Sequence, residues 1–339
     1  MRGGRYNDLK SKYCSRVFKC IFFLLLFAFF LFLVCFLFPE LFPENRYSLD
    51  WWYKKTAWQS LIDNEEKEVI VAVIDTGVNI EHEALSGKIW VNEHEVLNGI
   101  DDDGNGYVDD IYGWNFVNEN NEVAETEISH GTAVSGLIVG DGKMAGVASF
   151  APIKVMVLKV LDDNGESYNS TNLARAIEYA ENNGATICNC SFGMEEYSNE
   201  LFDVIKKSNM LFITSAGNSS QGRSLNRMEY YPAKYNLPNI IVVSACEENG
   251  LPWIHANYGS EVVDLYAKGV EMYTCSIDGY NYFSGVSLSI PMVTGVAAII
   301  ESYGCSSDFG NIKNILLEYF SLSNSKLIPY CKNGKQLIS

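Results

Sequence analysis

The sequence predicts an α/β protein of three layers, a mostly parallel β-sheet with helices on both faces, preceded by one transmembrane helix. From residue 68 onward, short apolar segments alternate with segments of helical composition. This alternation is typical of a parallel sheet whose strands are connected by helices. Before this region, residues 21–38 form an apolar run without a charge. As a helix this run would be about 27 Å long, close to the thickness of a bilayer core.

The N-terminal segments predict a membrane anchor. Residues 1–20 carry six basic side chains, and the positive-inside rule places such a tail in the cytoplasm and the chain after residue 38 outside the cell. A cleaved signal peptide is the alternative, but its apolar core usually has about 7–15 residues and precedes a small-x-small site. No such site follows Phe38. We therefore expect a single-pass protein of the cell membrane, with a linker over residues 39–67.

The charge of the chain changes after the anchor. Residues 1–40 hold six basic and two acidic side chains, whereas the remainder holds 19 basic and 40 acidic ones. Such an acidic surface disfavours binding to a polyanion, so we expect no nucleic-acid partner. We expect the chain to act as a monomer.

The elements of the sheet domain follow in order over residues 68–325, and residues 326–339 are expected to form a C-terminal tail. Continuous apolar runs predict buried strands, and apolar periodicity with capping residues predicts helices. If the domain contains a disulfide, we expect Cys305 with Cys331; buried free thiols are the alternative. The predicted strands cover residues 69–74, 153–160, 186–190, 211–215 and 240–245, and the predicted helices cover residues 130–139, 171–183, 199–207, 293–300 and 311–319.

Four polar residues stand at the ends of these elements. Asp75 and Asn218 each follow a predicted strand, while His130 and Ser287 each stand at the start of a helical segment. Each of these residues, taken alone, has a common structural explanation. A serine before a helix, for example, is usually a cap. The ends of parallel strands converge at one edge of a sheet, however. An acid, an imidazole, an amide and a hydroxyl are also the four groups that acyl transfer requires.

These residues lie in motifs that resemble those of the subtilisin-like serine proteases, and the resemblance runs from about Trp58 to Leu317. Their order along the chain and their spacing both agree with that family. The motifs are Val73-Ile74-Asp75-Thr76-Gly77, His130-Gly131-Thr132, Ser191-Phe192-Gly193, Ala216-Gly217-Asn218 and Gly285-Val286-Ser287 with Pro291 four residues later.

The resemblance implies a role for each residue and a polypeptide substrate. Ser287 is implied to be the nucleophile, His130 its general base, and Asp75 the group that orients the imidazole. Asn218 and the Ser287 backbone N–H would stabilise the oxyanion. Two segments would form the substrate pocket: Ser191, Phe192 and Gly193, as a strand that pairs with the substrate backbone, and Ser215, Ala216 and Gly217. Residues 162–168 would form the opposite side of the cleft.

The sequence departs from the family at two places. Val286 stands where the family usually has threonine, directly before the nucleophile. Many relatives also carry an N-terminal folding segment, and residues 39–68 are too short to form such a domain. We therefore expect activity without removal of a large propeptide.

An acidic loop between Asp75 and His130 predicts a structural calcium ion. Gly106 stands at the sharp turn of such a loop, and Tyr112 occupies the twelfth position, where a glutamate is usual, with Asp110 as a substitute. An acidic surface turn held by its own hydrogen bonds is the alternative. The expected ligands alternate along the chain: Asp101, Asp103, Asn105, the carbonyl of Tyr107, and Asp109.

Two functions from different classes follow from these residues. The first is an endopeptidase anchored outside the cytoplasmic membrane, acting on exported peptides. The second is a catalytically silent module that binds peptides in the same cleft. Chemical reactivity of Ser287 distinguishes between them, because only the first requires an activated hydroxyl.

Overall fold

We analysed a computed structural model of the protein, which describes residues 66–162, 164–165 and 169–337. The predicted cytoplasmic tail, the predicted span over residues 21–38 and nearly all of the predicted linker lie outside these residues. Among the helices that the structure describes, none is both long and apolar enough to cross a bilayer.

Within the described residues, nine strands form one sheet in the order β10-β11-β7-β6-β5-β4-β1-β3-β2. The pair β10–β11 is antiparallel, and the other pairs of this sheet are parallel. β8 and β9 form a separate antiparallel hairpin. The strands are β1 (Val69–Asp75), β2 (Gly113–Asn115), β3 (Ile153–Lys159), β4 (Ile187–Cys190), β5 (Leu211–Ser215), β6 (Ile240–Cys246), β7 (Leu265–Lys268), β8 (Met272–Ser276), β9 (Gly279–Phe283), β10 (Ser321–Ser323) and β11 (Lys335–Leu337).

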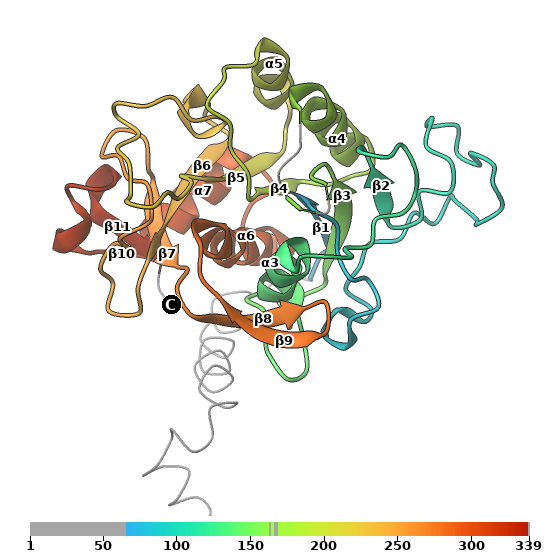
Figure 1. Ribbon diagram of the computed structural model, residues 1–339, viewed down its shortest axis with the longest axis horizontal. Helices are drawn as coiled ribbons and strands as arrows, with labels where there is room; N and C mark the ends of the chain where they lie inside the picture. The colour runs from blue at the N-terminus through green and yellow to red at the C-terminus, as the bar shows by residue number, and fades with distance from the viewer. Residues whose placement is uncertain (1–65, 163, 166–168, 338–339) are drawn as a thin grey trace, which may run out of the picture. The chain divides into compact units, whose positions relative to one another are not determined.

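Helices cover both faces of the sheet, as the sequence predicts (Figure 1). On one face α3 (His130–Val139) packs against α6 (Val286–Ser302), and α6 crosses β4, β5, β6 and β7. On the other face α4 (Ser170–Asn182) packs against α5 (Asn199–Lys207). α7 (Phe309–Tyr319) lies beside α6. Because both faces are covered, the central strands are apolar throughout rather than alternating.

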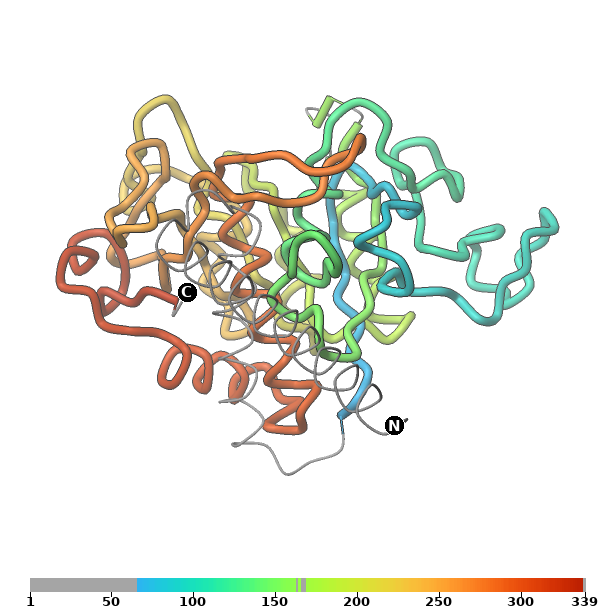
Figure 2. The backbone as a smooth tube through the Cα atoms, turned by 90° about the horizontal axis from the view of Figure 1, so that it is seen from below, coloured from blue at the N-terminus to red at the C-terminus, as the bar shows by residue number. Residues whose placement is uncertain are grey.

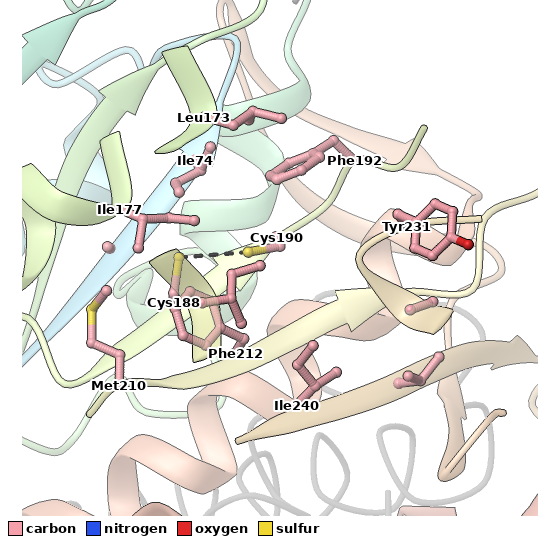
Figure 3. Packing of buried hydrophobic residues seen from close by; sticks show 14 of the residues in the cluster. Ile74, Leu173, Ile177, Cys188, Cys190, Phe192, Met210, Phe212, Tyr231 and Ile240 are labelled. Carbon is pink, nitrogen blue, oxygen red and sulfur yellow. Dashed lines mark hydrogen bonds between the residues drawn. The ribbon is translucent and has the colours of Figure 1, made fainter. Parts of the chain in front are cut away.

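The core beneath α4 shows how strand and helix periodicity meet. Ile74 of β1, Cys188 of β4 and Phe212 of β5 point toward Leu173 and Ile177 of α4 (Figure 3), and all five side chains are fully buried. These strand residues belong to one face of the sheet because side chains alternate along a strand. The six described cysteines are free thiols, so the expected pairing of Cys305 with Cys331 is wrong. Cys305 is exposed, whereas Cys331 is buried.

The C-terminal segment differs from its prediction as a tail. Residues 335–337 form β11, which pairs with β7 on one side and with β10 on the other. Figure 2 shows the red C-terminal chain at one end of the sheet domain, opposite the loop around residue 100. Leu327, Cys331 and Leu337 are buried there. The segment has three-residue strands, too short to give a periodic signal in the sequence.

Candidate active site

The end of β1 and the start of α3 bring an acid and a base together. Asp75 is the last residue of β1 and is almost fully buried, while His130 is the first residue of α3. The Nδ1 atom of His130 lies 2.6 Å from Oδ1 of Asp75. The Asp75 oxygen also accepts the backbone N–H of Thr76 at 2.8 Å. The carboxylate therefore fixes one ring nitrogen and leaves Nε2 as the nitrogen available to a substrate or nucleophile.

The surroundings of His130 make it a stronger base than a free imidazole. Burial lowers its pKa, but the charge and hydrogen bond of Asp75, together with the charge of Glu125, outweigh this effect and raise the pKa above its ordinary value. A negative partner favours the protonated ring because it stabilises the positive charge. Such a ring takes up a proton readily, as a general base must.

Glu125 is a buried carboxylate beside this pair that the sequence analysis missed. Its oxygens accept the backbone N–H groups of Gly131 and Thr132, each at 3.0 Å, and the Thr132 hydroxyl at 2.6 Å. Thr76 donates its hydroxyl to the same carboxylate. Burial raises the pKa of Glu125, and the hydrogen bonds from Thr132 and Thr76 oppose that rise. Glu125 thus accepts hydrogen bonds from two free amides at the start of α3. Its negative charge is favourable there because the N-terminus is the positive end of the helix dipole.

A local signal for Glu125 does exist. An acid close before a helix is a common partner of the first-turn amides, and Glu125 precedes His130 by five residues. Three glutamates stand at positions 122, 125 and 127, and the sequence does not distinguish which one folds inward. Only Glu125 of these is buried.

Ser287 is the second residue of α6 and is half-buried. Its backbone N–H belongs to the first turn, where helical bonding leaves amides unpaired. Pro291 has no N–H to donate to the carbonyl of Ser287, four residues earlier. Instead, the hydroxyl of Ser191 donates to that carbonyl at 3.4 Å. The Ser191 hydrogen bond therefore links the start of α6 to the end of β4.

A buried hydrogen-bond chain supports Ser191. Asn189, fully buried in β4, donates its side-chain amide to the Ser191 hydroxyl at 2.9 Å. Thr294 in α6 donates its hydroxyl to the Asn189 side-chain oxygen at 2.9 Å. These bonds link the interior of α6 to the strand end beside Ser287.

The strand register places the predicted residues at one edge of the sheet. Ile74 of β1 pairs with Cys190 of β4, so Asp75 and Ser191 follow neighbouring positions. Cys190 pairs in turn with Thr214 of β5, which precedes Ser215. His130 bonds to the first of these strand ends and Ser287 to the second.

The segment after β5 carries the predicted oxyanion donor. Ser215 and Ala216 are buried, and the Ser215 hydroxyl accepts the Gly217 N–H at 2.8 Å, which closes the turn. Asn218 follows with its side chain exposed, and it forms an isolated bridge with Ala256. An exposed amide at this edge is able to donate to an oxygen of a bound peptide.

Val286, the departure noted in the sequence, is fully buried in the core cluster. Its side chain therefore packs inward while Ser287 stays half-buried at the surface of the site. An apolar residue at this position costs no buried hydrogen bond.

The acidic loop brings two of the predicted ligand residues, Asp103 and Asn105, together with Glu95 and Asp110. Asp101 accepts backbone N–H groups of its own turn, from Gly104 at 2.7 Å and Gly106 at 2.8 Å. Asp109 accepts the N–H groups of Asn98 and Gly99. These two predicted ligands thus accept backbone N–H groups of the loop.

Asp103, also a predicted ligand, lies instead with Glu95 and Asp110. One carboxylate oxygen from each of the three lies within 4.8 Å of the others, and Glu95 and Asp110 are buried. Asn105, a further predicted ligand, donates its side-chain amide to Asp103 at 3.1 Å and to Asp110 at 3.0 Å. Tyr107 packs its ring on Tyr179, whose hydroxyl donates to Asp110 at 2.5 Å.

Comparisons with known proteins agree with this geometry. A sequence model described as the subtilase family matches residues 66–316. Subtilisin-like protease 1 of Plasmodium berghei (strain Anka) is 30% identical to the chain over 302 residues, which cover 82% of this chain and 50% of that relative. The chain therefore spans about half the length of this curated relative.

Two solved structures share the fold. A cold adapted subtilisin-like serine proteinase is 27% identical with a TM-score of 0.62, and the match covers 80% of this chain and 88% of the other. The prenylagaramide maturation protease PagA is 26% identical with a TM-score of 0.60, and the match covers 80% of this chain and 89% of the other.

Proposed function

The chain belongs to the subtilase family, and we propose on this basis that it is a serine endopeptidase that cleaves peptide bonds through an acyl-enzyme. The observation that carries the proposal is the 2.6 Å contact of His130 with buried Asp75, at a strand end adjacent to the one that holds Ser287. A buried carboxylate on Nδ1 sets the tautomer in which Nε2 accepts a proton.

In the proposed reaction, the Ser287 hydroxyl oxygen attacks the substrate carbonyl carbon while its proton passes to Nε2 of His130. The oxyanion accepts hydrogen bonds from the Asn218 side chain and the Ser287 N–H. The imidazolium then gives its proton to the leaving amine as the C–N bond breaks, and the acyl group stays on Ser287. Water repeats the sequence with His130 as base and releases the acid. Each oxyanion donor of this kind contributes about 10²–10³ in turnover.

A fluorophosphonate probe tests the nucleophile directly. We expect the wild-type chain to be labelled and Ser287→Ala to remain unlabelled, with Ser284→Ala, an exposed serine three residues earlier, as the labelled control. Labelling of Ser287→Ala would assign the nucleophile to another residue. A folded wild-type chain that takes no label would favour the silent peptide-binding module.

We also propose that the protein is anchored in the cell membrane by residues 21–38 and processes exported peptides. The proposal rests on the uncharged run after six basic residues and on the likeness to a protease described as a maturation enzyme. In cells that express the protein, we expect the full chain to stay in the membrane fraction after carbonate extraction. We also expect protease added outside intact cells to remove the sheet domain. Release of the domain into the medium would contradict the anchor.

Calcium binding is a further proposal for the acidic loop. Three carboxylates from Glu95, Asp103 and Asp110 meet within 4.8 Å, and hard oxygen donors are the set that calcium prefers. The side-chain amide of Asn105 faces the same group, and a half-turn of that amide would present its oxygen instead of its nitrogen. The donor set therefore fits a calcium ion in a structural role.

Calorimetry and thermal unfolding test the calcium proposal. We expect binding heat on addition of calcium and a lower melting temperature in chelator, with both effects lost in Asp110→Asn. Asp102→Asn is the control, since Asp102 lies in the same loop but outside the cluster. No heat and no effect of chelator would leave a loop held by its own hydrogen bonds.

A further inference from the structure

We propose that Tyr230 restricts the substrate to glycine, alanine or serine at the residue that supplies the scissile carbonyl. The inference rests on the proposed endopeptidase function and adds a substrate class to it. Tyr230 lies in the loop between β5 and β6, next to none of the predicted catalytic residues in sequence. The tertiary structure brings its ring against both segments that were predicted to bind substrate.

Two glycines define the place of the ring. A Cβ atom added to Gly193 would lie 2.2 Å from Cζ of Tyr230, and one added to Gly217 would lie 2.5 Å from the same atom. Both separations are far below van der Waals contact, so the ring stands directly against two backbones that have no side chain. The phenol thus occupies the slot between the segments Ser191–Gly193 and Ser215–Gly217.

This slot is where the side chain of the acyl residue belongs. The scissile carbonyl must lie within reach of Ser287 and of Asn218 at the same time. Asn218 directly follows Gly217, and Ser191 is hydrogen bonded to the carbonyl of Ser287. In the residue whose carbonyl is held between these groups, the carbonyl carbon and Cβ are both bonded to the same Cα, so Cβ lies close to these groups as well. Its side chain therefore points between the two glycine segments.

The backbone around Tyr230 is fixed rather than loose. Tyr231 and Met194 exchange two backbone hydrogen bonds, with N···O distances of 2.8 and 2.9 Å. The carbonyl of Tyr230 accepts the N–H of Lys234 at 3.0 Å. Since Met194 directly follows Gly193, these bonds tie the chain that carries Tyr230 to the strand that borders the slot. The ring is itself half-buried.

A filled slot selects by size. Large side chains would have to displace the ring from its contacts with both glycine backbones, whereas a hydrogen, a methyl or a hydroxymethyl group needs no such displacement. Overpacking of a fitted site is unfavourable, and differences of a methylene or more in a pocket change kcat/KM by about 10–200-fold. Replacing Tyr230 with glycine would open the slot.

The test uses the full chain and internally quenched peptides that differ only in the acyl residue, which is alanine, leucine or phenylalanine. We expect wild type to prefer alanine over phenylalanine by about 10-fold or more. Tyr230→Gly should raise kcat/KM for phenylalanine and leucine, relative to the value for alanine, by about 10-fold or more. Tyr230→Phe should keep the wild-type order because it keeps the ring. Tyr319→Gly, at an exposed tyrosine of α7, is the control.

Two outcomes would overturn the inference. One is a wild-type enzyme that cleaves after phenylalanine as well as after alanine. The other is a folded Tyr230→Gly variant with unchanged preference. Phosphonate labelling of Ser287 verifies that the active site of each variant is folded. If Tyr230→Gly takes no label, the inference is tested instead by the preference of Tyr230→Ala and by the wild-type rates on the three peptides. Failure of the proposed function itself looks different, because no peptide would then be cleaved by any variant.

Discussion

At the scale of single residues, the imidazole of His130 is influenced by two buried carboxylates rather than one. Asp75 contacts the ring directly, and Glu125 acts on it through its charge while bonding to the next two backbone amides. Thr76 links them, since its hydroxyl reaches Glu125 and also lies 3.1 Å from Asp75. Glu125 is therefore a positioning residue that also raises the pKa of His130, the proposed general base.

Glu125→Gln should shift the acidic limb of the pH profile of kcat/KM to lower pH. His130 must be neutral to accept the serine proton, so activity rises as pH rises through its pKa. The negative charge of Glu125 raises that pKa, and a neutral glutamine removes the charge and lowers the pKa. Rates of peptide hydrolysis measured from pH 4 to 9 give the pH at which the acidic limb lies. Glu127→Gln, an exposed acid two residues later, should leave the limb in place.

A limb that stays fixed or moves to higher pH in Glu125→Gln would show that Glu125 does not act on His130 by charge. A purely structural role would change kcat and the melting temperature without moving the limb, so the pH profile separates the two.

At the scale of elements, α3 depends on close contact with the loop after β1. A Cβ on Gly131 would lie 2.0 Å from the carbonyl oxygen of Gly77 and 3.2 Å from Cβ of Asp75. Asp75 ends β1, and Gly77 lies in the loop that follows this strand. The helix therefore approaches this strand end at a distance that only glycine permits, and the approach brings His130 within reach of Asp75.

Gly131→Ala should destabilise the fold by about 1–3 kcal/mol through overpacking and lower kcat/KM by about 10²-fold through displacement of His130. Gly310→Ala is a matched control, because Gly310 is likewise the second residue of its helix and its added Cβ would meet only a side-chain oxygen at 3.2 Å. Alanine there should be neutral or stabilise by about 0.5–1 kcal/mol. Chemical denaturation and peptide hydrolysis measure both variants, and equal behaviour of the two would refute the close-contact argument.

The start of α6 shows the same dependence on neighbouring elements. Pro291 leaves the Ser287 carbonyl without a helical donor, and Ser191, the residue directly after β4, supplies one. The helix that carries the proposed nucleophile is thereby joined to the strand next to β1. α6 also packs directly against α3.

At the scale of the whole molecule, the sheet extends to the end of the described chain. β11 lies between β7 and β10, so residues 335–337 belong to the sheet rather than to a tail. The sequence boundary at residue 325 was wrong because three-residue strands carry no measurable period. Their place is decided by the backbone pairing of β11 with β7 and β10.

Deletion of residues 326–339 should therefore lower the melting temperature by more than about 10 °C or prevent folding. Burial of one leucine contributes about 1.5–3 kcal/mol, and the segment buries Leu327 and Leu337, against a total stability of about 5–15 kcal/mol. Calorimetric melting of the full and shortened chains measures the loss. Ile328→Ala, at an exposed side chain of the same segment, should have little effect. An unchanged melting temperature after the deletion would restore the description as a tail.

The sequence alone determined the central architecture of this protein, because burial on both faces of a sheet leaves continuous apolar runs and burial of one helix face leaves a period. It also determined which polar residues stand at element ends, including Asp75, His130, Asn218 and Ser287. Such information is local, so it can be recognised from the sequence alone.

Tertiary structure alone decided which acids turn inward and what fills the substrate slot. Glu125 rather than Glu122 or Glu127 reaches α3, and Asp103 joins Glu95 rather than Asp101. Tyr230 meets Gly193 and Gly217 across loops that have no period. These partners are set by the path of irregular chain between fixed elements, and that path depends on long-range packing that no local pattern in the sequence encodes.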